Sequence, residues 1–346
     1  MDRLKVWVFM GGPSAEHDVS LVSGRGLVQA LDHNRFEVTP VFISKEMEWC
    51  WTKEPLSSEK QNKFELKMLE ELPTQRAVRP ALDQLPACDI ALLGLHGRFG
   101  EDGTVQALLD YFNIPYTGSG RLASALAMHK VKSKEIYRQN NIPTADWAVI
   151  SRDDLAKDNI SKRLKSLRWP LFFKDPEGGS SIDMGRAENI EEAKPLIQKL
   201  LAKFPELLAE SFIQGRECSI GWLEGAPTPL PPTEIIPEGD YFDFEAKYQG
   251  KSREVTPAPF SPELTQQLQE LAEKAHTSLG CAVYSRTDFI VDEKGNPWAL
   301  ETNTLPGFTP TSLLPQQAAA IGLNYSALVE HILRSSLERF GKRWNG

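Results

Sequence analysis

The chain has 346 residues, which is too long for one small hydrophobic core and predicts two or three domains. A hydrophobic content of 41% and a charged content of 25% are ordinary for a globular protein. The formal net charge of −8 argues against nucleic acid or an anionic membrane as a partner. No apolar stretch approaches the roughly 20 residues that span a bilayer. We therefore expect a protein that binds neither.

The first residues and the cysteines predict a cytoplasmic location. The start, MDRLKVWVFMGG, is basic and then apolar, but its apolar run is only five residues long and ends in a glycine pair. That pattern predicts a buried strand rather than a signal peptide. The four cysteines have no CxxC spacing, so we expect free thiols in a reducing compartment: Cys50, Cys88, Cys218 and Cys281.

Apolar runs alternate with helical patterns through the first third of the chain. KVWVFMGG precedes VSLVSGRGLVQALD, then FEVTPVFIS follows, and DIALLGLHG precedes TVQALLDYFN. This rhythm is typical of βαβ units with a parallel sheet. Ligands gather at the carboxyl ends of strands in such sheets, so the loops at 11–16 and 96–103 are candidate sites.

A Pro- and Gly-rich stretch at 113–120 predicts a domain boundary. A long amphipathic helix is predicted next, over LASALAMHKVKSKEIYRQ, followed by a small α+β unit with a helix at about 190–203 and the strand LLAESFI. From GRECSIGWL onward the pattern predicts antiparallel strands, a helix at about 262–280, a hairpin and two terminal helices.

The hairpin AVYSRTDFIVDEKGNPWALETNT contains acids whose register can be predicted. If Asp292 pairs with Pro297 around the turn EKGN, Asp288 lies directly opposite Glu301. Opposed side chains have Cβ atoms about 4.5–5.5 Å apart, and two carboxylates that close repel unless a proton or a cation joins them. The alternatives are a one-residue register slip, or a solvated edge where the acids splay apart.

The same register places Asn303 on the face of Glu301 and opposite Arg286. Two carboxylates and an amide oxygen form a set suited to a hard cation such as Mg²⁺. Since Mg²⁺ usually takes its other ligands from water and phosphate, the set also points to a nucleotide.

The chain has no P-loop of the form GxxxxGKS or GxxxxGKT. It does have KDPEGGSS (174–181), in which a lysine at a strand end precedes a small-residue loop. The backbone N–H groups of such a loop are suited to covering phosphates. An ordinary glycine-rich turn is the alternative.

Seven stretches, collinear from about residue 5 to 335, resemble the D-alanine–D-alanine ligase family of the ATP-grasp superfamily: GGPSAEHDVSL, LHGRFGEDGTVQALLDYFNIPYTGSG, ASALAMHKVKSK, EGGSS, DFEAKY, RTDF and ETNTLPGFTPTSLLP. The resemblance implies a mixed α/β and α+β chain of three domains. These would be an N-terminal parallel-sheet domain at 1–118 and two ATP-grasp subdomains at 119–213 and 214–346. ATP would lie between the last two, and the amino acids at their junction with the first.

The family's reaction phosphorylates the carboxylate of one D-alanine, and the amine of a second attacks the acyl phosphate to give a peptidoglycan precursor. The resemblance therefore implies ATP, D-alanine and two Mg²⁺ or Mn²⁺ ions, and a homodimer as in other members. Tyr248 favours D-alanine as acceptor, since members that accept D-lactate tend to lack this tyrosine. The alternatives are a ligase with D-serine or D-lactate as acceptor, or a divergent nucleotide-binding paralogue with little activity.

The resemblance assigns residues to the nucleotide and the metal. The metal ligands would be Asp288, Glu301 and Asn303, and the lysines near the phosphates Lys130, Lys174 and Lys247. The segment that meets adenine would be Glu210, Ser211, Phe212 and Ile213. The acid on the ribose would be Glu217. Solvated surface lysines and acids are the alternatives for these charged residues.

The resemblance also assigns residues to the amino acids. Oxyanion donors would be Arg286 and the Gly307 N–H, and Glu16 would hold the first ammonium. Ser180 and Tyr248 would be bonded to Glu16 and tie a loop shut, while the carboxylate of the second substrate would meet Ser312 and Leu313, and His96 would orient substrate.

Each of these roles has a structural alternative. They are a salt bridge for Arg286, a helix N-terminal acid for Glu16, a cap for Ser312 and a core histidine for His96. For Ser180 and Tyr248 the alternatives are a loop hydroxyl and a half-buried tyrosine.

The chain departs from the family pattern near the phosphates. Asp175 follows Lys174 where proline is usual, Asp183 replaces a glycine in EGGSSID, and His129 replaces aspartate in MHK. Because glycine adopts a positive φ more readily than aspartate, we expect Asp183 to alter a left-handed backbone conformation at this position. We expect these changes to affect ATP affinity and turnover more than the type of reaction.

Overall fold

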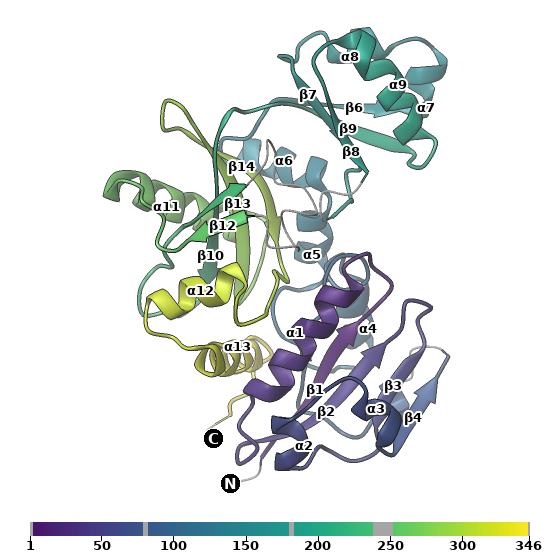
Figure 1. Cartoon of the computed structure of the whole chain (residues 1–346), viewed down its shortest axis with the longest axis vertical. Helices are drawn as coiled ribbons and strands as arrows, with labels where there is room; N and C mark the ends of the chain where they lie inside the picture. Colours follow the sequence, from purple (N-terminus) through teal and green to yellow (C-terminus); the bar gives the residue numbers. More distant parts are fainter. Residues whose placement is uncertain (1–2, 79–81, 180–182, 238–251, 345–346) are drawn as a thin grey trace.

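A computed structural model of the chain describes residues 3–78, 82–179, 183–237 and 252–344. The fold is mixed α/β and is built on three separate sheets. Figure 1 shows them along one elongated molecule, with the N-terminal sheet at one end, the smallest sheet at the other and the third between them. Among the described residues, no helix is long and apolar enough to cross a bilayer.

The N-terminal sheet has the order β4-β3-β2-β1-β5: β1 (Leu4–Gly11), β2 (Phe36–Ile43), β3 (Trp49–Thr52), β4 (Thr74–Ala77) and β5 (Ile90–Leu93). β1 pairs in parallel with β2 and β5, which confirms the predicted parallel arrangement. β3 and β4 extend the sheet in antiparallel fashion. The helical segments of this unit are α1 (His17–Ala30), α2 (Ser58–Asn62), α3 (Met68–Glu71), η1 (Leu82–Gln84) and α4 (Thr104–Tyr111).

The smallest sheet is antiparallel throughout and has the order β6-β9-β7-β8: β6 (Trp147–Ser151), β7 (Leu171–Lys174), β8 (Met184–Ala187) and β9 (Glu206–Ser211). Three helices pack on it: α7 (Arg152–Ala156), α8 (Ile160–Leu164) and α9 (Ile190–Leu201). Their apolar faces enclose a separate core that includes Phe173 and Ile197. The predicted α+β unit and its helix are confirmed.

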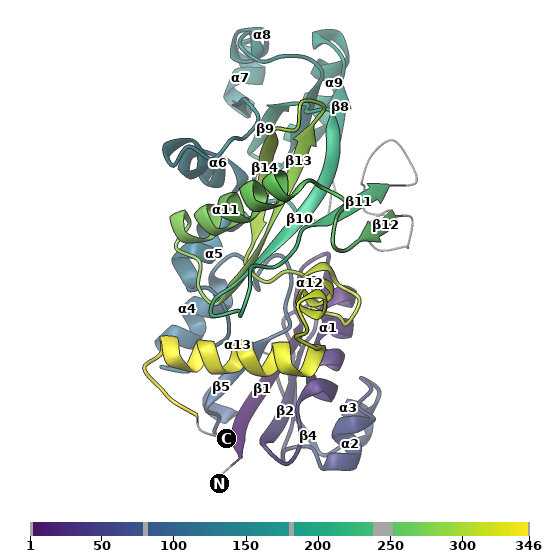
Figure 2. The same cartoon turned by 90° about the vertical axis from the view of Figure 1, so that its left-hand side faces the viewer.

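The third sheet is also antiparallel, with the order β12-β11-β10-β13-β14: β10 (Gly215–Leu223), β11 (Thr233–Pro237), β12 (Ser252–Val255), β13 (Tyr284–Asp292) and β14 (Pro297–Asn303). The later helices are α11 (Pro262–Ser278), α12 (Leu313–Ala320) and α13 (Tyr325–Arg339), as predicted. Helix α13 packs beside the N-terminal sheet (Figure 2), and its apolar face shares one core with β1 and β5.

One predicted helix is wrong. The stretch from Arg121 to Gln139 forms two helices, α5 (Arg121–Met128) and α6 (Lys130–Gln139), because His129 between them is extended, with φ −87° and ψ 96°. The Lys130 N–H donates to the carbonyl oxygen of Pro176. This break turns the start of α6 toward the 175–179 loop. Both helices contribute to the core of the third sheet.

Candidate active site

The β13–β14 hairpin places acid opposite acid, as the sequence predicted. Asp288 pairs with Glu301, and Arg286 pairs with Asn303. The predicted pairing at the turn is wrong, because Pro297 lies opposite the residue before Asp292. A bulge between these two parts of the ladder restores the register at the acids.

Asp292 serves the turn rather than the ladder. Its Oδ1 accepts hydrogen bonds from the backbone N–H groups of Lys294 at 2.9 Å and Asn296 at 2.8 Å. Aspartate commonly stabilises a turn in this way. The turn therefore contains one residue more than predicted, and the bulge shifts the pairing back by one residue before the ladder reaches the acids.

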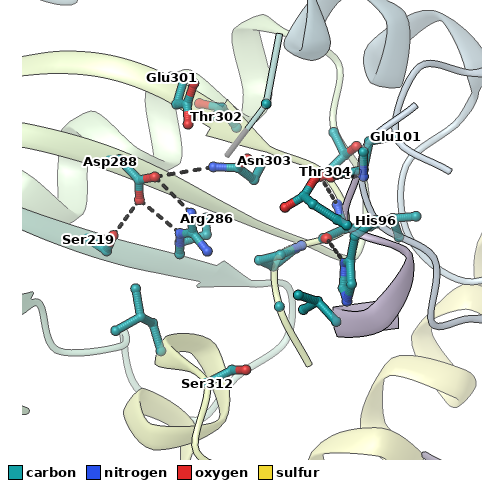
Figure 3. Close-up of a pocket in the computed structure, with 18 of the residues that line it drawn as sticks. His96, Glu101, Ser219, Arg286, Asp288, Glu301, Thr302, Asn303, Thr304 and Ser312 are labelled. Atoms are coloured by element: carbon teal, nitrogen blue, oxygen red, sulfur yellow. Dashed lines mark hydrogen bonds and ion pairs between the residues drawn. The ribbon is translucent and has the colours of Figure 1, made fainter. Parts of the chain in front are cut away.

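Asp288 is buried, with 5% of its surface exposed, and faces several polar groups (Figure 3). Arg286 donates to both carboxylate oxygens, from Nε at 2.8 Å and Nη2 at 2.7 Å. The Ser219 hydroxyl donates to Oδ1, and Asn303 Nδ2 lies 3.3 Å from Oδ2. Arg286 therefore forms the salt bridge that was its structural alternative, and it does so within the candidate site.

Glu301 has a cation beside it as well. Its Oε2 lies 3.0 Å from Lys130 Nζ, which also donates to the carbonyl oxygen of Gly178 at 2.5 Å. Lys130 is buried, so it is not a solvated surface lysine. It connects one carboxylate of the hairpin to the small-residue loop that was predicted to cover phosphates.

Glu210 lies between two lysines. Its Oε1 is 2.6 Å from Lys174 Nζ, and its Oε2 is 3.0 Å from Lys134 Nζ. Although burial acts to raise the pKa of Glu210, the two ammonium groups lower it to about 2. Burial lowers the pKa of Lys134, while the negative charge of Glu210 overcomes burial and raises that of Lys174. None of these three groups is a solvated surface charge.

Sequence reasoning missed Lys134, whose side chain is 0% exposed. It lies one helical turn after Lys130, and its Nζ donates to Thr144 Oγ1 at 2.7 Å and lies 5.6 Å from the centre of the Trp147 ring. The i, i+4 spacing of two lysines on α6 was a signal available in the sequence.

A cavity of about 700 Å³ lies where the N-terminal unit meets the third sheet. Its walls come from the start of α1, the 96–101 loop, the tip of the 175–179 loop, the β13–β14 hairpin and the segment before α12. Eleven predicted site residues line it: Glu16, His96, Lys130, Glu217, Arg286, Asp288, Glu301, Asn303, Gly307, Ser312 and Leu313.

Five of the other predicted residues do not line this cavity. Lys174, Glu210 and Ser211 lie in the smallest sheet, and Phe212 and Ile213 follow it directly. The Phe212 N–H donates to the carbonyl oxygen of Pro170 at 3.0 Å. Three further predicted residues lie outside the described part of the chain: Ser180, Lys247 and Tyr248.

His96 is a buried histidine that also lines the cavity. Its Nδ1 lies 2.9 Å from the carbonyl oxygen of Leu305, and its Nε2 lies 2.8 Å from Ser23 Oγ. Burial lowers the pKa of His96, which favours the neutral ring with its proton on Nδ1. His96 is therefore a core histidine with access to the cavity, and its role toward substrate stays a prediction.

Glu16 occupies the N-cap position of α1, as its structural alternative required, and it also lines the cavity. Gly97 has a φ of +63°, and a Cβ atom there would lie 2.6 Å from Glu16 Oε2. A glycine is therefore needed for this approach of the 96–101 loop to the carboxylate.

Ser312 precedes α12, but its hydroxyl does not cap that helix. Its Oγ instead accepts a hydrogen bond from the Thr309 N–H at 3.0 Å. A Cβ atom on Gly307 would lie 3.2 Å from Ser312 Oγ, so these two predicted residues are neighbours in the wall of the cavity.

The unusual loop residues are accommodated locally. Asp183 has a φ of +52°, the left-handed conformation that aspartate adopts more readily than most residues, and it forms an ion pair with Lys203. Asp175 Oδ1 accepts a hydrogen bond from the Glu177 N–H at 3.1 Å and stabilises its own turn. His129 ends α5 in an extended conformation.

The donor set at the hairpin suits an ion that takes few protein carboxylates. Over the described residues, no three His, Cys, Asp or Glu side chains come together as a metal cluster. Two opposed carboxylates and an amide are sufficient for Mg²⁺, which completes its shell from water and phosphate. All four cysteines are free, as predicted.

Comparison with known proteins gives the following similarities. A family model described as D-ala D-ala ligase N-terminus matches residues 5–119, and one described as D-ala D-ala ligase C-terminus matches residues 136–334. The D-alanine–D-alanine ligase of Leptospira biflexa is 40% identical over 352 aligned residues, covering 97% of this chain and 100% of the relative.

Two solved structures have the same fold over nearly their whole length. The D-alanine–D-alanine ligase from Coxiella burnetii superposes with a TM-score of 0.86 at 28% identity, covering 99% of this chain and 96% of the other. The D-alanine–D-alanine ligase from Bacillus anthracis, complexed with ATP, superposes with a TM-score of 0.75 at 31% identity, covering 98% and 99%.

Proposed function

Because the chain belongs to the D-alanine–D-alanine ligase family of ATP-grasp enzymes, we propose that it joins two D-alanines with consumption of ATP. The products are D-alanyl-D-alanine, ADP and phosphate, and the dipeptide serves peptidoglycan synthesis. The observation that carries the proposal is the cavity itself, which brings the acids of the hairpin, Arg286 and the 304–313 segment to one place. Use of ATP is supported by the relative from Bacillus anthracis that was solved with it.

In the first step, a carboxylate oxygen of one D-alanine attacks the γ-phosphorus of ATP, and ADP leaves. An ionised carboxylate is a poor electrophile, and the acyl phosphate gives it a good leaving group. Lys130 and Lys174 are the proposed contacts of the phosphates, and the N–H groups of the 175–179 loop would cover them. Glu217 and the strand end at 210–213 are the proposed contacts of the ribose and the adenine.

The hairpin would hold Mg²⁺, with Mn²⁺ as a substitute. Asp288, Glu301 and Asn303 line one wall of the cavity, and each carboxylate has a cationic side chain beside it. Bound Mg²⁺ would neutralise phosphate oxygens and polarise the phosphoryl group that is transferred.

In the second step, the amine of the other D-alanine attacks the acyl carbon, and phosphate leaves. Negative charge develops on the acyl oxygen, where Arg286 and the Gly307 N–H are the proposed donors. Glu16 would hold the ammonium of the first substrate, and Ser312 with the Leu313 N–H would hold the carboxylate of the second. Ser180 and Tyr248 are proposed to close the site, and Lys247 to meet the γ-phosphate.

The test is ADP release from Mg²⁺-ATP in the presence of single amino acids. We expect release with D-alanine and none above background with L-alanine, and a product with the mass of D-alanyl-D-alanine. Mixed incubations with D-serine or D-lactate would reveal a different acceptor by product mass. Tight ATP binding without turnover on any D-amino acid would contradict the proposal and favour a nucleotide-binding paralogue.

We also propose a cytoplasmic location and a homodimer. The free cysteines and the dependence on ATP support the location. The mass of the purified protein by light scattering tests the dimer, and a monomer at micromolar concentration would contradict it.

A further inference from the structure

The peptide group of Leu305 is held at both of its polar ends by the N-terminal unit. Its N–H donates to Glu101 Oε1 at 3.1 Å, and its carbonyl oxygen accepts from His96 Nδ1 at 2.9 Å. Figure 3 shows Glu101 and His96 reaching the end of the β13–β14 hairpin from the opposite side of the cavity. Leu305 is two residues before Gly307, whose N–H is the proposed oxyanion donor.

Glu101 is buried, with 8% of its surface exposed, and its second oxygen is used as well. Oε2 accepts from the Gly97 N–H at 2.7 Å, so one carboxyl group joins the backbones of two loops. Burial and then the negative charge of Glu16 raise the pKa of Glu101 to about 8, against the opposing effect of its two backbone donors. Burying an acid is costly, and a packing role alone would be served by an apolar side chain.

A third contact fixes the same segment farther along. The Phe308 N–H donates to Ser23 Oγ at 3.3 Å, and that hydroxyl is also bonded to His96 Nε2. Backbone groups on both sides of Gly307 are therefore attached to α1 and to the 96–101 loop. Rotation of the 305 peptide would move the Gly307 N–H.

We propose that Glu101 is a positioning residue for the oxyanion loop, residues 304–307. By accepting hydrogen bonds from both the Leu305 N–H and the Gly97 N–H, its carboxylate sets where the Gly307 N–H meets the reacting group. The inference rests on the proposed ligase function and adds a residue to it. It also means that the loop on the third sheet is positioned by a side chain of the N-terminal unit.

The test uses three substitutions at one position in the full-length enzyme. Glu101→Met removes both acceptors at similar length, Glu101→Asp keeps the acid but shortens its reach, and Glu101→Gln keeps length and an acceptor. A misplacement of about 1 Å in an active site costs on the order of 100-fold. We expect kcat to fall about 10- to 100-fold in the Met and Asp variants and less in the Gln variant. The KM for ATP should stay within about threefold.

Asp102→Asn is the matched control. Asp102 also accepts hydrogen bonds from two backbone N–H groups, of Phe99 at 2.8 Å and Thr104 at 2.9 Å, but both lie within three residues of it in the sequence. We expect Asp102→Asn to lower the melting temperature by as much as Glu101→Gln does. Its kcat should nevertheless stay within about threefold of the parent.

Two results would overturn the inference. One is a folded Met or Asp variant with kcat within about threefold of the parent, and the other is an equal loss of kcat in Asp102→Asn. If the Met variant does not fold, the Asp variant decides, because it retains the acid group. A parent enzyme that releases no ADP with D-alanine contradicts the proposed function instead, so the two failures are distinguishable.

Discussion

Glu301→Gln tests the central geometric feature of the site, the pair of acids that face each other across the hairpin. The substitution removes one negative charge and keeps the volume of the side chain. Glu301 Oε2 lies 3.0 Å from Lys130 Nζ, and 24% of the glutamate side chain is exposed. A partly exposed ion pair of this kind contributes about 1 kcal/mol or less to folding. We therefore expect the melting temperature to fall by only about 2–4 °C.

The expected effect on catalysis is much larger. A cation at this site would lose one of its two carboxylate partners, and metal stabilisation of transferred phosphoryl groups is worth several kcal/mol. A loss of about 3–4 kcal/mol corresponds to a fall in kcat of roughly 100- to 1,000-fold. The concentration of Mg²⁺ needed for half-maximal rate should rise as well.

ADP release is measured across a Mg²⁺ titration for the parent and the variant, with thermal unfolding measured on the same samples. Glu293→Gln is the matched control, because it makes the same chemical change on the exposed turn of the same hairpin. It should leave both quantities unchanged. A Glu301→Gln enzyme with kcat within about threefold of the parent at all Mg²⁺ concentrations would refute the assignment of the metal site.

Three further predictions concern the buried charges and the approach to Glu16. Lys134→Met should lower the free energy of unfolding by about 1–3 kcal/mol. This is less than the loss for a fully broken buried pair, because Lys174 still faces Glu210. Urea unfolding measures the change, and a value below about 0.5 kcal/mol would contradict the prediction. The folded-state pKa of Glu210 is depressed to about 2 from 4.5, so its stabilisation is present above pH 4.5 and is lost as pH falls toward 2. Glu210→Gln should accordingly flatten the pH dependence of unfolding in that window, and an unchanged slope would count against the lysine pairing. Gly97→Ala places a methyl group 2.6 Å from Glu16 Oε2. It should raise the KM for D-alanine about tenfold and change the KM for ATP less. Equal changes in the two KM values would instead indicate a general distortion of the site.

Much of the hairpin was predictable because side chains on a strand alternate with a period of two. Glu301 and Asn303 fall on one face whatever the register, and Asp288 shares that face in the register observed, whereas a one-residue slip would move it to the other face. The bulge was not predictable, because it depends on how Asp292 satisfies the N–H groups of the turn. Two compensating shifts left the prediction at the acids correct and the prediction at the turn wrong.

Residues whose partners lie far away in the sequence were missed. Lys134 meets Glu210, 76 positions later (210 − 134), and Glu101 meets Leu305, 204 positions later (305 − 101). Helical periodicity places Lys134 on the same face as Lys130, but it does not identify a distant partner such as Glu210. The break at His129 was missed for the same reason, because the bond that orients α6 comes from the 175–179 loop.

Helix α13 completes the hydrophobic core around the N-terminal sheet, since Leu328, Ile332 and Leu333 are buried together with residues of β1 and β5. On the ribosome, the N-terminal unit emerges long before this helix. The interval from Tyr116 to Tyr325 is 209 residues (325 − 116), or on the order of 10–40 s of translation at about 5–20 residues per second. During that time β1 and β5 lack the cover that α13 provides, so the core of the N-terminal unit cannot be completed before residues 325–339 have been made.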